Sequence, residues 1–76
     1  MPTVIIIAGL RIEIYTNDHP PPHFHVTAGS RRAKFDIATG TMLQGDLDKR
    51  SIRKVRRWME FNGDLLMQVW ISSRPK

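Results

Sequence analysis

The first part of the chain alternates between apolar and polar residues with the period of two that is typical of β-strands. A short aliphatic run covers residues 4–8, and after Gly9 the apolar residues Leu10, Ile12 and Ile14 alternate with polar neighbours. Successive side chains of a strand project to opposite faces of a sheet. This segment therefore predicts a β-hairpin with one buried face.

A second alternating segment begins at His23 and predicts another hairpin, whose strands are separated by a turn at Gly29–Ser30. Residues 42–44 form a further short stretch before Gly45, and we interpret them as an edge strand. Together these segments predict an antiparallel sheet of four or five strands. The residues of the second hairpin that should face the core are Phe24, Val26, Ala28, Ala33, Phe35 and Ile37.

The apolar period changes after Asp46-Leu47-Asp48, a segment that offers an acidic cap for a helix. The residues Ile52, Val55, Trp58 and Met59 then fall on one side of an α-helix, and we predict that Trp58 is buried against the sheet.

The dipeptide Asn62–Gly63 indicates the end of this helix, and Asp64 can cap a second, shorter one. Strands followed by helices predict a single small α+β domain over residues 1–76. We expect two helices packed on one face of the sheet. The apolar side of the second helix should contain Leu65, Leu66, Val69 and Trp70.

Positive charge is concentrated in the first predicted helix. The chain of 76 residues has 12 Lys and Arg against 7 Asp and Glu, and six of the twelve bases lie in residues 49–57, where no acid occurs. Such a field favours a polyanion, an acidic protein or an anionic surface, and the plain alternative is a solvated helix face. We predict nucleic acid as the partner, with RNA first. The predicted contacts are Arg32, Lys34, Lys49, Arg50, Arg53, Lys54 and Arg57.

Chain length and cysteine content bear on the expected cellular compartment and oligomeric state. The sequence has no cysteine, so disulfides and thiolate zinc ligands are excluded and a reducing cytoplasm is expected. The N-terminal apolar run is far shorter than the roughly 20 residues of a membrane span, so no membrane is predicted as a partner. A domain this small has a thin stability margin, and a second copy or another partner would add to it.

All three histidines of the chain lie in the segment Asn17-Asp18-His19-Pro20-Pro21-Pro22-His23-Phe24-His25-Val26. The prolines fix the backbone, and His23 and His25, two apart in a strand, should leave the same exposed sheet face. Asp18 beside His19 could orient a ring. Three interpretations stay open: half-exposed residues with local hydrogen bonds, a metal site, or phosphate binding with acid–base chemistry.

Among these, we predict a catalytic set of His19, His23 and His25 without a metal or another cofactor. The sequence lacks a glycine-rich phosphate loop, a G-x-S-x-G elbow and an H-E-x-x-H motif. An imidazole can take the 2′-OH proton of RNA while a cation holds the phosphate, so the enzyme class that fits is a ribonuclease.

Several motifs together point to a family. The stretches MPTV, IYTNDHPPPHFHV, AKFDIATG and LQGDL, with a V-x-x-W helix and a final tryptophan, resemble the small bacterial proteins catalogued as domain of unknown function four-one-six-zero. Such proteins are usually encoded beside a second small protein, and some are regarded as toxins of toxin–antitoxin pairs. The resemblance implies a cytoplasmic protein with a cognate antitoxin-like partner. The strongly basic helix differs from the more acidic one of many members.

The function predicted from the sequence is a toxin-like component of a bacterial toxin–antitoxin pair that binds or cleaves RNA. One alternative is a noncatalytic interaction module whose helix docks against an acidic protein. Another is a small histidine metal-binding protein.

Overall fold

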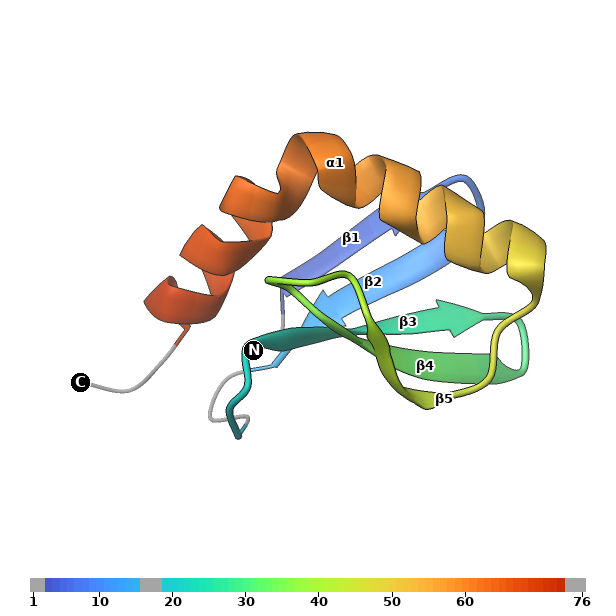
Figure 1. The fold of residues 1–76 in the computed structure, drawn as a ribbon, viewed down its shortest axis with the longest axis horizontal. Helices are drawn as coiled ribbons and strands as arrows, with labels where there is room; N and C mark the ends of the chain where they lie inside the picture. Colours follow the sequence, from blue (N-terminus) through green and yellow to red (C-terminus); the bar gives the residue numbers. More distant parts are fainter. Residues whose placement is uncertain (1–2, 16–18, 74–76) are drawn as a thin grey trace.

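The computed structural model describes residues 3–15 and 19–73 of the chain. These residues form one antiparallel sheet in which each strand pairs with the next along the chain, in the order β1-β2-β3-β4-β5 (Figure 1). The five-stranded sheet and the edge strand before Gly45 confirm the prediction from alternation. The strands are β1 (Thr3–Ile7), β2 (Leu10–Ile14), β3 (His23–Ala28), β4 (Arg31–Asp36) and β5 (Met42–Gly45).

A two-residue turn connects β1 to β2. Ile7 pairs with Leu10, and the two residues between them, Ala8 and Gly9, have φ angles of 44° and 80°. Positive φ at both central positions matches the right-handed twist of the strands. The aliphatic run that precedes Gly9 therefore becomes an edge strand paired with β2.

Within residues 19–73 one helix, α1 (Lys49–Ser72), follows the sheet, so the prediction of two helices is wrong. Gly63 does not take the left-handed conformation that ends helices, and Asn62 donates its side-chain N–H to the carbonyl of Trp58 at 2.9 Å. The chain bends near this point but remains helical (Figure 1). Local helix-end signals were overridden by the apolar residues on both sides of Gly63, which pack against the same sheet.

The helix begins where the sequence predicts it. Asp48 is the N-cap residue, and its carboxylate accepts hydrogen bonds from the backbone N–H and the hydroxyl of Ser51. These bonds satisfy a backbone donor that the first helical turn leaves without an internal partner. The hydrogen bond from the Ser51 hydroxyl is the main cause that lowers the pKa of Asp48 below its ordinary value.

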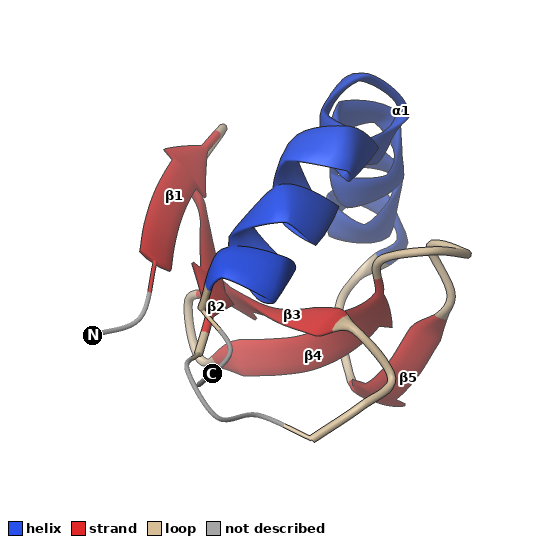
Figure 2. Cartoon of the chain, turned by 90° about the vertical axis from the view of Figure 1, so that its left-hand side faces the viewer, coloured by secondary structure: helices blue, strands red, loops and turns tan. Residues whose placement is uncertain are grey.

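The core lies between α1 and one face of the sheet (Figure 2). Phe24 and Phe35 stack on neighbouring strands with ring centroids 5.6 Å apart, and the helix contributes Val55 and Leu66, which are fully buried. Trp70 is 5% exposed. The remaining buried apolar residues are Leu10, Ile12, Ile14, Val26, Ala33, Ile37 and Leu47.

Two apolar residues of the helix are less buried than predicted. Trp58 is only partly buried and packs at the margin of the core, and Leu65 is 50% exposed. The bend places Leu66 and Trp70, one and two turns beyond Asn62, toward the sheet instead. Trp70 therefore fills the role in the core that the sequence assigned to Trp58.

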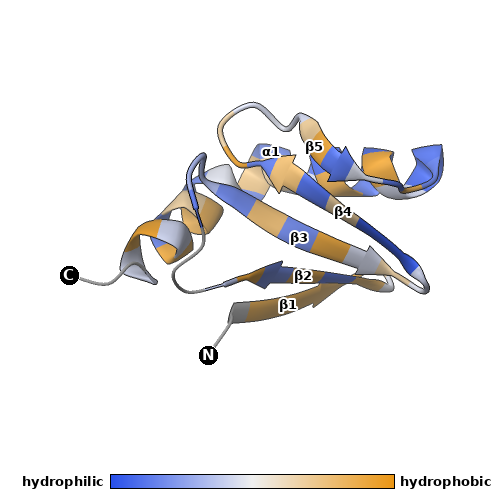
Figure 3. Cartoon of the chain, turned by 90° about the horizontal axis from the view of Figure 1, so that it is seen from below, coloured by the Kyte–Doolittle hydropathy of each residue, from blue (hydrophilic) through white to orange (hydrophobic). Residues whose placement is uncertain are grey.

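The other face of the sheet is not covered by the helix (Figure 3). At its edge, β1 exposes Val4 (41%) and Ile6 (72%) and contains no charged residue. The polar residues of the alternating pattern occupy the remaining strands of this open face.

Candidate functional site

A shallow depression of about 490 Å³ lies on the open face of the sheet. Cross-strand pairing places Glu13 opposite His25, His25 opposite Lys34, and Lys34 opposite Gln44, so four polar residues form one row across β2 to β5. The next row contains Arg11, Thr27 and Arg32. Because each of these side chains occupies the polar position of its strand, they project together from the same face.

Glu13 is held at the β2 side of the depression by two neighbours. Its Oε1 lies 3.2 Å from Nε of Arg11, and its Oε2 accepts a hydrogen bond from the hydroxyl of Tyr15 at 3.1 Å. The Glu13 side chain is 13% exposed. Both carboxylate oxygens are thus oriented, and each keeps acceptor capacity toward the depression.

The pKa of Tyr15 reflects its burial and the charges beside Glu13. Burial raises the pKa of Tyr15 above 10.0, and the hydrogen bond to Glu13 and its negative charge raise it further. The positive charges of Arg32 and Arg11 act in the opposite direction. The Tyr15 ring meets His25 edge-on, with centroids 4.7 Å apart. Tyr15 therefore remains a neutral phenol, with an aromatic face beside the imidazole.

The structure separates the three histidines that the sequence grouped. His25 is half-buried and lines the depression, His23 is 3% exposed, and His19 is exposed in the loop before β3. The expectation that His23 and His25 are both exposed is therefore wrong for His23, although their rings are in contact at a centroid distance of 5.2 Å. Asp18 lies outside the described residues.

His23 connects the end of the helix with the open face. Its ring centroid is 5.1 Å from that of Trp70, and its Nδ1 lies 2.7 Å from the carbonyl oxygen of Pro21. A carbonyl oxygen only accepts hydrogen bonds, so Nδ1 carries the proton in this contact. The proline segment thus supplies the acceptor that fixes the ring of His23.

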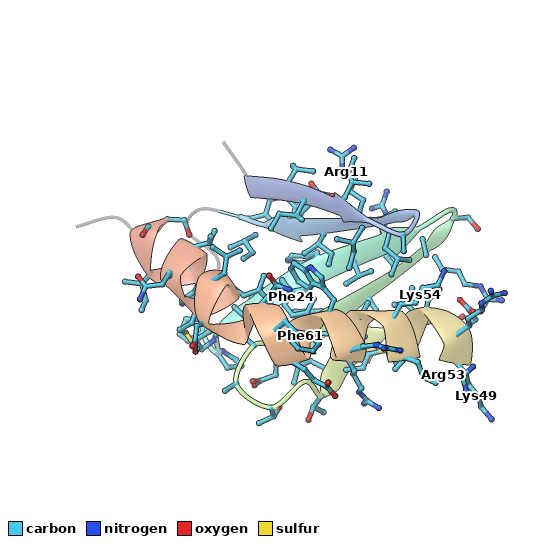
Figure 4. All side chains as sticks on the ribbon, turned by 90° about the horizontal axis from the view of Figure 1, so that it is seen from above. Arg11, Phe24, Lys49, Arg53, Lys54 and Phe61 are labelled. Carbon is cyan, nitrogen blue, oxygen red and sulfur yellow. The ribbon has the colours of Figure 1, made fainter. Side chains whose placement is uncertain are left out.

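The basic half of α1 forms a second candidate surface. Lys49, Arg53 and Lys54 project from the same end of the helix, whereas Phe61 lies near its middle (Figure 4). Arg56 donates from Nε to the carbonyl of Gly40 at 3.3 Å. The exposed cations in this half are Lys49, Arg50, Arg53, Lys54, Arg56 and Arg57.

Both surfaces meet at one end of the molecule. The start of β4 and the start of α1, each hydrophilic, lie at the same end (Figure 3). The backbone N–H of Asp46 donates to the carbonyl of Arg32 at 2.9 Å, and the carboxylate of Asp46 lies 3.7 Å from Arg31. The start of β4, which carries Arg31 and Arg32, is thus tied to the segment that leads into the basic half of α1.

His25, Arg32 and Lys34 were predicted as site residues, whereas Glu13 and Arg11, which line the same depression, were not. Both occupy the polar positions of the first hairpin, so their face could be predicted. Their neighbours could not, because the register of β2 against β3 is a property of the strand pair and not of the pattern within either strand. The pairing of Glu13 with His25 places the polar residues of β2 beside those of β3 in the depression.

Two further properties concern metals and membranes. Within residues 3–15 and 19–73, no three His, Cys, Asp or Glu side chains are placed to hold a metal ion. In the same part of the chain, no helix has the length and apolar character needed to cross a membrane.

Comparison with known proteins gives one match. No curated protein and no solved structure matches the chain. The model of one protein family, described as "Domain of unknown function (DUF4160)", matches residues 9–71, from the β1–β2 turn to the last turn of α1. The matched segment includes the proline and histidine motif, strands β2 to β5 of the open sheet face and the basic half of the helix. The chain therefore belongs to the family described as "Domain of unknown function (DUF4160)".

Proposed function

We propose that this protein binds RNA and is the toxin-type member of a pair with a small antitoxin-like protein. The observation that carries the proposal is the first half of α1, where six of the nine residues from Lys49 to Arg57 are basic and none is acidic. A surface of this kind tracks the phosphates of a nucleic acid.

The arrangement of these cations opposes the stability of the helix that carries them. The N-terminal end of a helix is positive, so cations there are unfavourable, and the first turn of α1 has no acid. Like charges four residues apart, such as Lys49 with Arg53, destabilise a helix by about 0.2–0.5 kcal/mol per pair. Among the described residues, none of the six cations forms an ion pair. A surface for a polyanionic ligand accounts for cations at positions where they lower the stability of the helix.

The open sheet face favours single-stranded RNA over a duplex. Tyr15 and His25 present aromatic rings beside Arg32 and Lys34, and unpaired bases stack on such rings while cations hold the adjoining phosphates. A duplex hides the faces of its bases within the stack. The basic end of α1 would bind the part of the strand that extends beyond this face at the end where β4 and α1 begin.

The binding proposal is tested by titrating a fluorescent single-stranded RNA with the protein over a series of salt concentrations. Replacement of Arg53, Lys54 and Arg57 with Ala should weaken binding and reduce the salt slope by about 0.7 for each phosphate that the variant no longer neutralises. The control is Arg53→Lys with Arg57→Lys, which keeps the charge and should keep the slope. An unchanged slope in the Ala variant would contradict the proposal.

The toxin proposal requires a separate test in cells. Expression of the chain in a bacterium should slow growth, and the triple Ala variant should relieve that effect while it accumulates to the same level. Support comes from the resemblance of the proline and histidine motif to a family of which some members are regarded as toxins, and from the basic surface. Normal growth at full expression would contradict toxicity and leave RNA binding to be judged by titration.

The second candidate function is an interaction module, which is favoured by exposed apolar residues on the same helix. Phe61 is 81% exposed and Leu65 is 50% exposed, and they lie four residues apart on α1. An acidic protein with an apolar patch would complement this surface. If Phe61→Ser with Leu65→Ser abolishes growth inhibition while RNA titration is unchanged, docking to a protein, and not RNA binding, is the cause of the inhibition.

A further inference from the structure

We infer that the open sheet face is a catalytic site for cleavage of single-stranded RNA, with Glu13 as general base and His25 as general acid. The inference rests on the proposed RNA binding and assigns the chemistry to a pair that the sequence alone did not suggest. It differs from a set of three histidines, because His23 is buried and only His25 among the three lines the depression.

The register of the sheet brings acid and base to adjacent positions. Glu13 on β2 is directly opposite His25 on β3. Side chains paired in this way have Cβ atoms about 4.5–5.5 Å apart on one face. This spacing allows a carboxylate and an imidazole to reach two oxygens on opposite sides of one phosphorus atom, as in-line displacement requires.

Both groups are oriented before a substrate arrives. Arg11 and Tyr15 each engage one oxygen of the Glu13 carboxylate. The imidazole of His25 lies edge-on between neighbours, with centroids 4.7 Å from Tyr15 and 5.2 Å from His23. Catalytic groups held by packing and by hydrogen bonds need less reorganisation in the transition state.

The positive charges needed for phosphoryl transfer lie on the other side of His25. Lys34 is directly opposite His25 on β4, and Arg32 lies two residues away on the same face. A cation at this position holds a nonbridging phosphate oxygen and stabilises the charge that develops on the pentavalent phosphorus. Base, acid and cation thus follow one another across three strands.

The proposed step balances without a metal ion or another co-reactant. The Glu13 carboxylate takes the proton of the 2′-OH, and the 2′-oxygen forms a bond to the adjacent phosphorus. The bond between phosphorus and the 5′-oxygen breaks, and protonated His25 gives its proton to that oxygen. The products are a strand that ends in a 2′,3′-cyclic phosphate and a strand that begins with a 5′-hydroxyl.

The experiment incubates the full chain with a labelled single-stranded RNA of mixed sequence and with the same sequence as DNA, both in the presence of a chelator. We expect cleavage of the RNA alone, with cyclic phosphate ends. Placing 2′-deoxy residues at the cleaved positions should abolish cleavage there. Cleavage of DNA, or RNA products without cyclic phosphate or the 3′-phosphate formed from it, would overturn the mechanism.

Variants at the pair give the decisive measurement. Glu13→Gln and His25→Ala should each slow cleavage by about 100-fold or more, the usual contribution of a general acid or base. In Glu13→Gln, RNA affinity measured by titration of the same fluorescent RNA should change less than about threefold, because this change removes only the base. His25→Ala should also weaken RNA binding, because its ring stacks an unpaired base, so its cleavage rate is compared with the parent at saturating protein. Glu60→Gln is the matched control, since it makes the same chemical change on the exposed side of α1 and should cleave like the parent.

The outcomes separate this inference from the proposed function. Absence of RNA binding by the parent would overturn both. Tight binding without cleavage across RNAs of varied sequence would overturn the catalytic assignment and leave RNA binding intact. Cleavage that survives in the folded Glu13→Gln and His25→Ala variants would likewise overturn the assignment of the pair.

Discussion

The replacement Gly63→Ala tests why α1 is one helix. Gly63 has a helical conformation, and a Cβ atom built on it meets no atom within 4 Å. Glycine in a helix interior costs about 1 kcal/mol relative to alanine, through its larger entropy in the unfolded chain. We therefore expect the variant to be more stable by about 0.5–1 kcal/mol.

The expected gain is large enough to measure by thermal unfolding. An unfolding entropy of about 2.1 cal/mol/K per residue gives about 160 cal/mol/K for a 76-residue chain. A gain of about 1 kcal/mol then raises Tm by about 6 °C. Circular dichroism of the parent and the variant at equal concentration measures this shift.

A contrasting glycine provides the control. At Gly45, φ is +100° and a Cβ atom would lie 2.3 Å from the carbonyl oxygen of Arg32 and 2.6 Å from Cα of Ala33. The backbone of β4 would have to move, so Gly45→Ala should lower stability by about 1–3 kcal/mol. A Gly63→Ala variant that melts at or below the parent would refute the reasoning, because it would show that the bend requires glycine.

Three other predictions concern titratable groups. Asp48→Ala should lower Tm at neutral pH. The folded-state pKa of Asp48 lies below its ordinary 3.8, so the stability that its carboxylate adds is complete above pH 3.8 and is lost as pH falls through the lowered pKa. The Tm values of parent and variant should therefore converge in acid. Absorbance titration of Tyr15, the only tyrosine of the sequence, should give a pKa above 10.0, and this pKa should decrease in Glu13→Ala. The stability that the neutral phenol adds is present below pH 10 and is lost as pH rises through the raised pKa. His23→Ala should lower stability by about 1–3 kcal/mol, since the ring is buried against Trp70, and a melting curve like that of the parent would contradict this.

The sheet was predictable because its signal is local. Alternation along Leu10 to Ile14 and from His23 onward identifies both the strands and the buried face, and glycines identify the turns. The helix start was predictable for the same reason, from the capping carboxylate of Asp48. The end of the helix was not, because Asn62 and Gly63 carry end signals that tertiary packing overrides.

The candidate site was predictable only in part. Its cations and His25 follow from residue type and strand face, but the partner of His25 depends on how β2 and β3 align. That alignment places buried Ile12 opposite buried Val26, which is a contact between strands and not a motif. The burial of His23 against Trp70 could not be predicted either, because the two residues are far apart in the sequence and meet only in the folded chain.

The exposed edge of β1 has a consequence for colloidal behaviour. Sheet edges that carry neither charge nor proline tend to pair with one another, and here Val4 and Ile6 add apolar surface to such an edge. Mutual repulsion of chains with a net charge of +5 opposes such pairing. A bound polyanion that neutralises the cations of α1 would remove this repulsion, so the same contact that occupies the basic end would also promote clustering of the protein along its ligand.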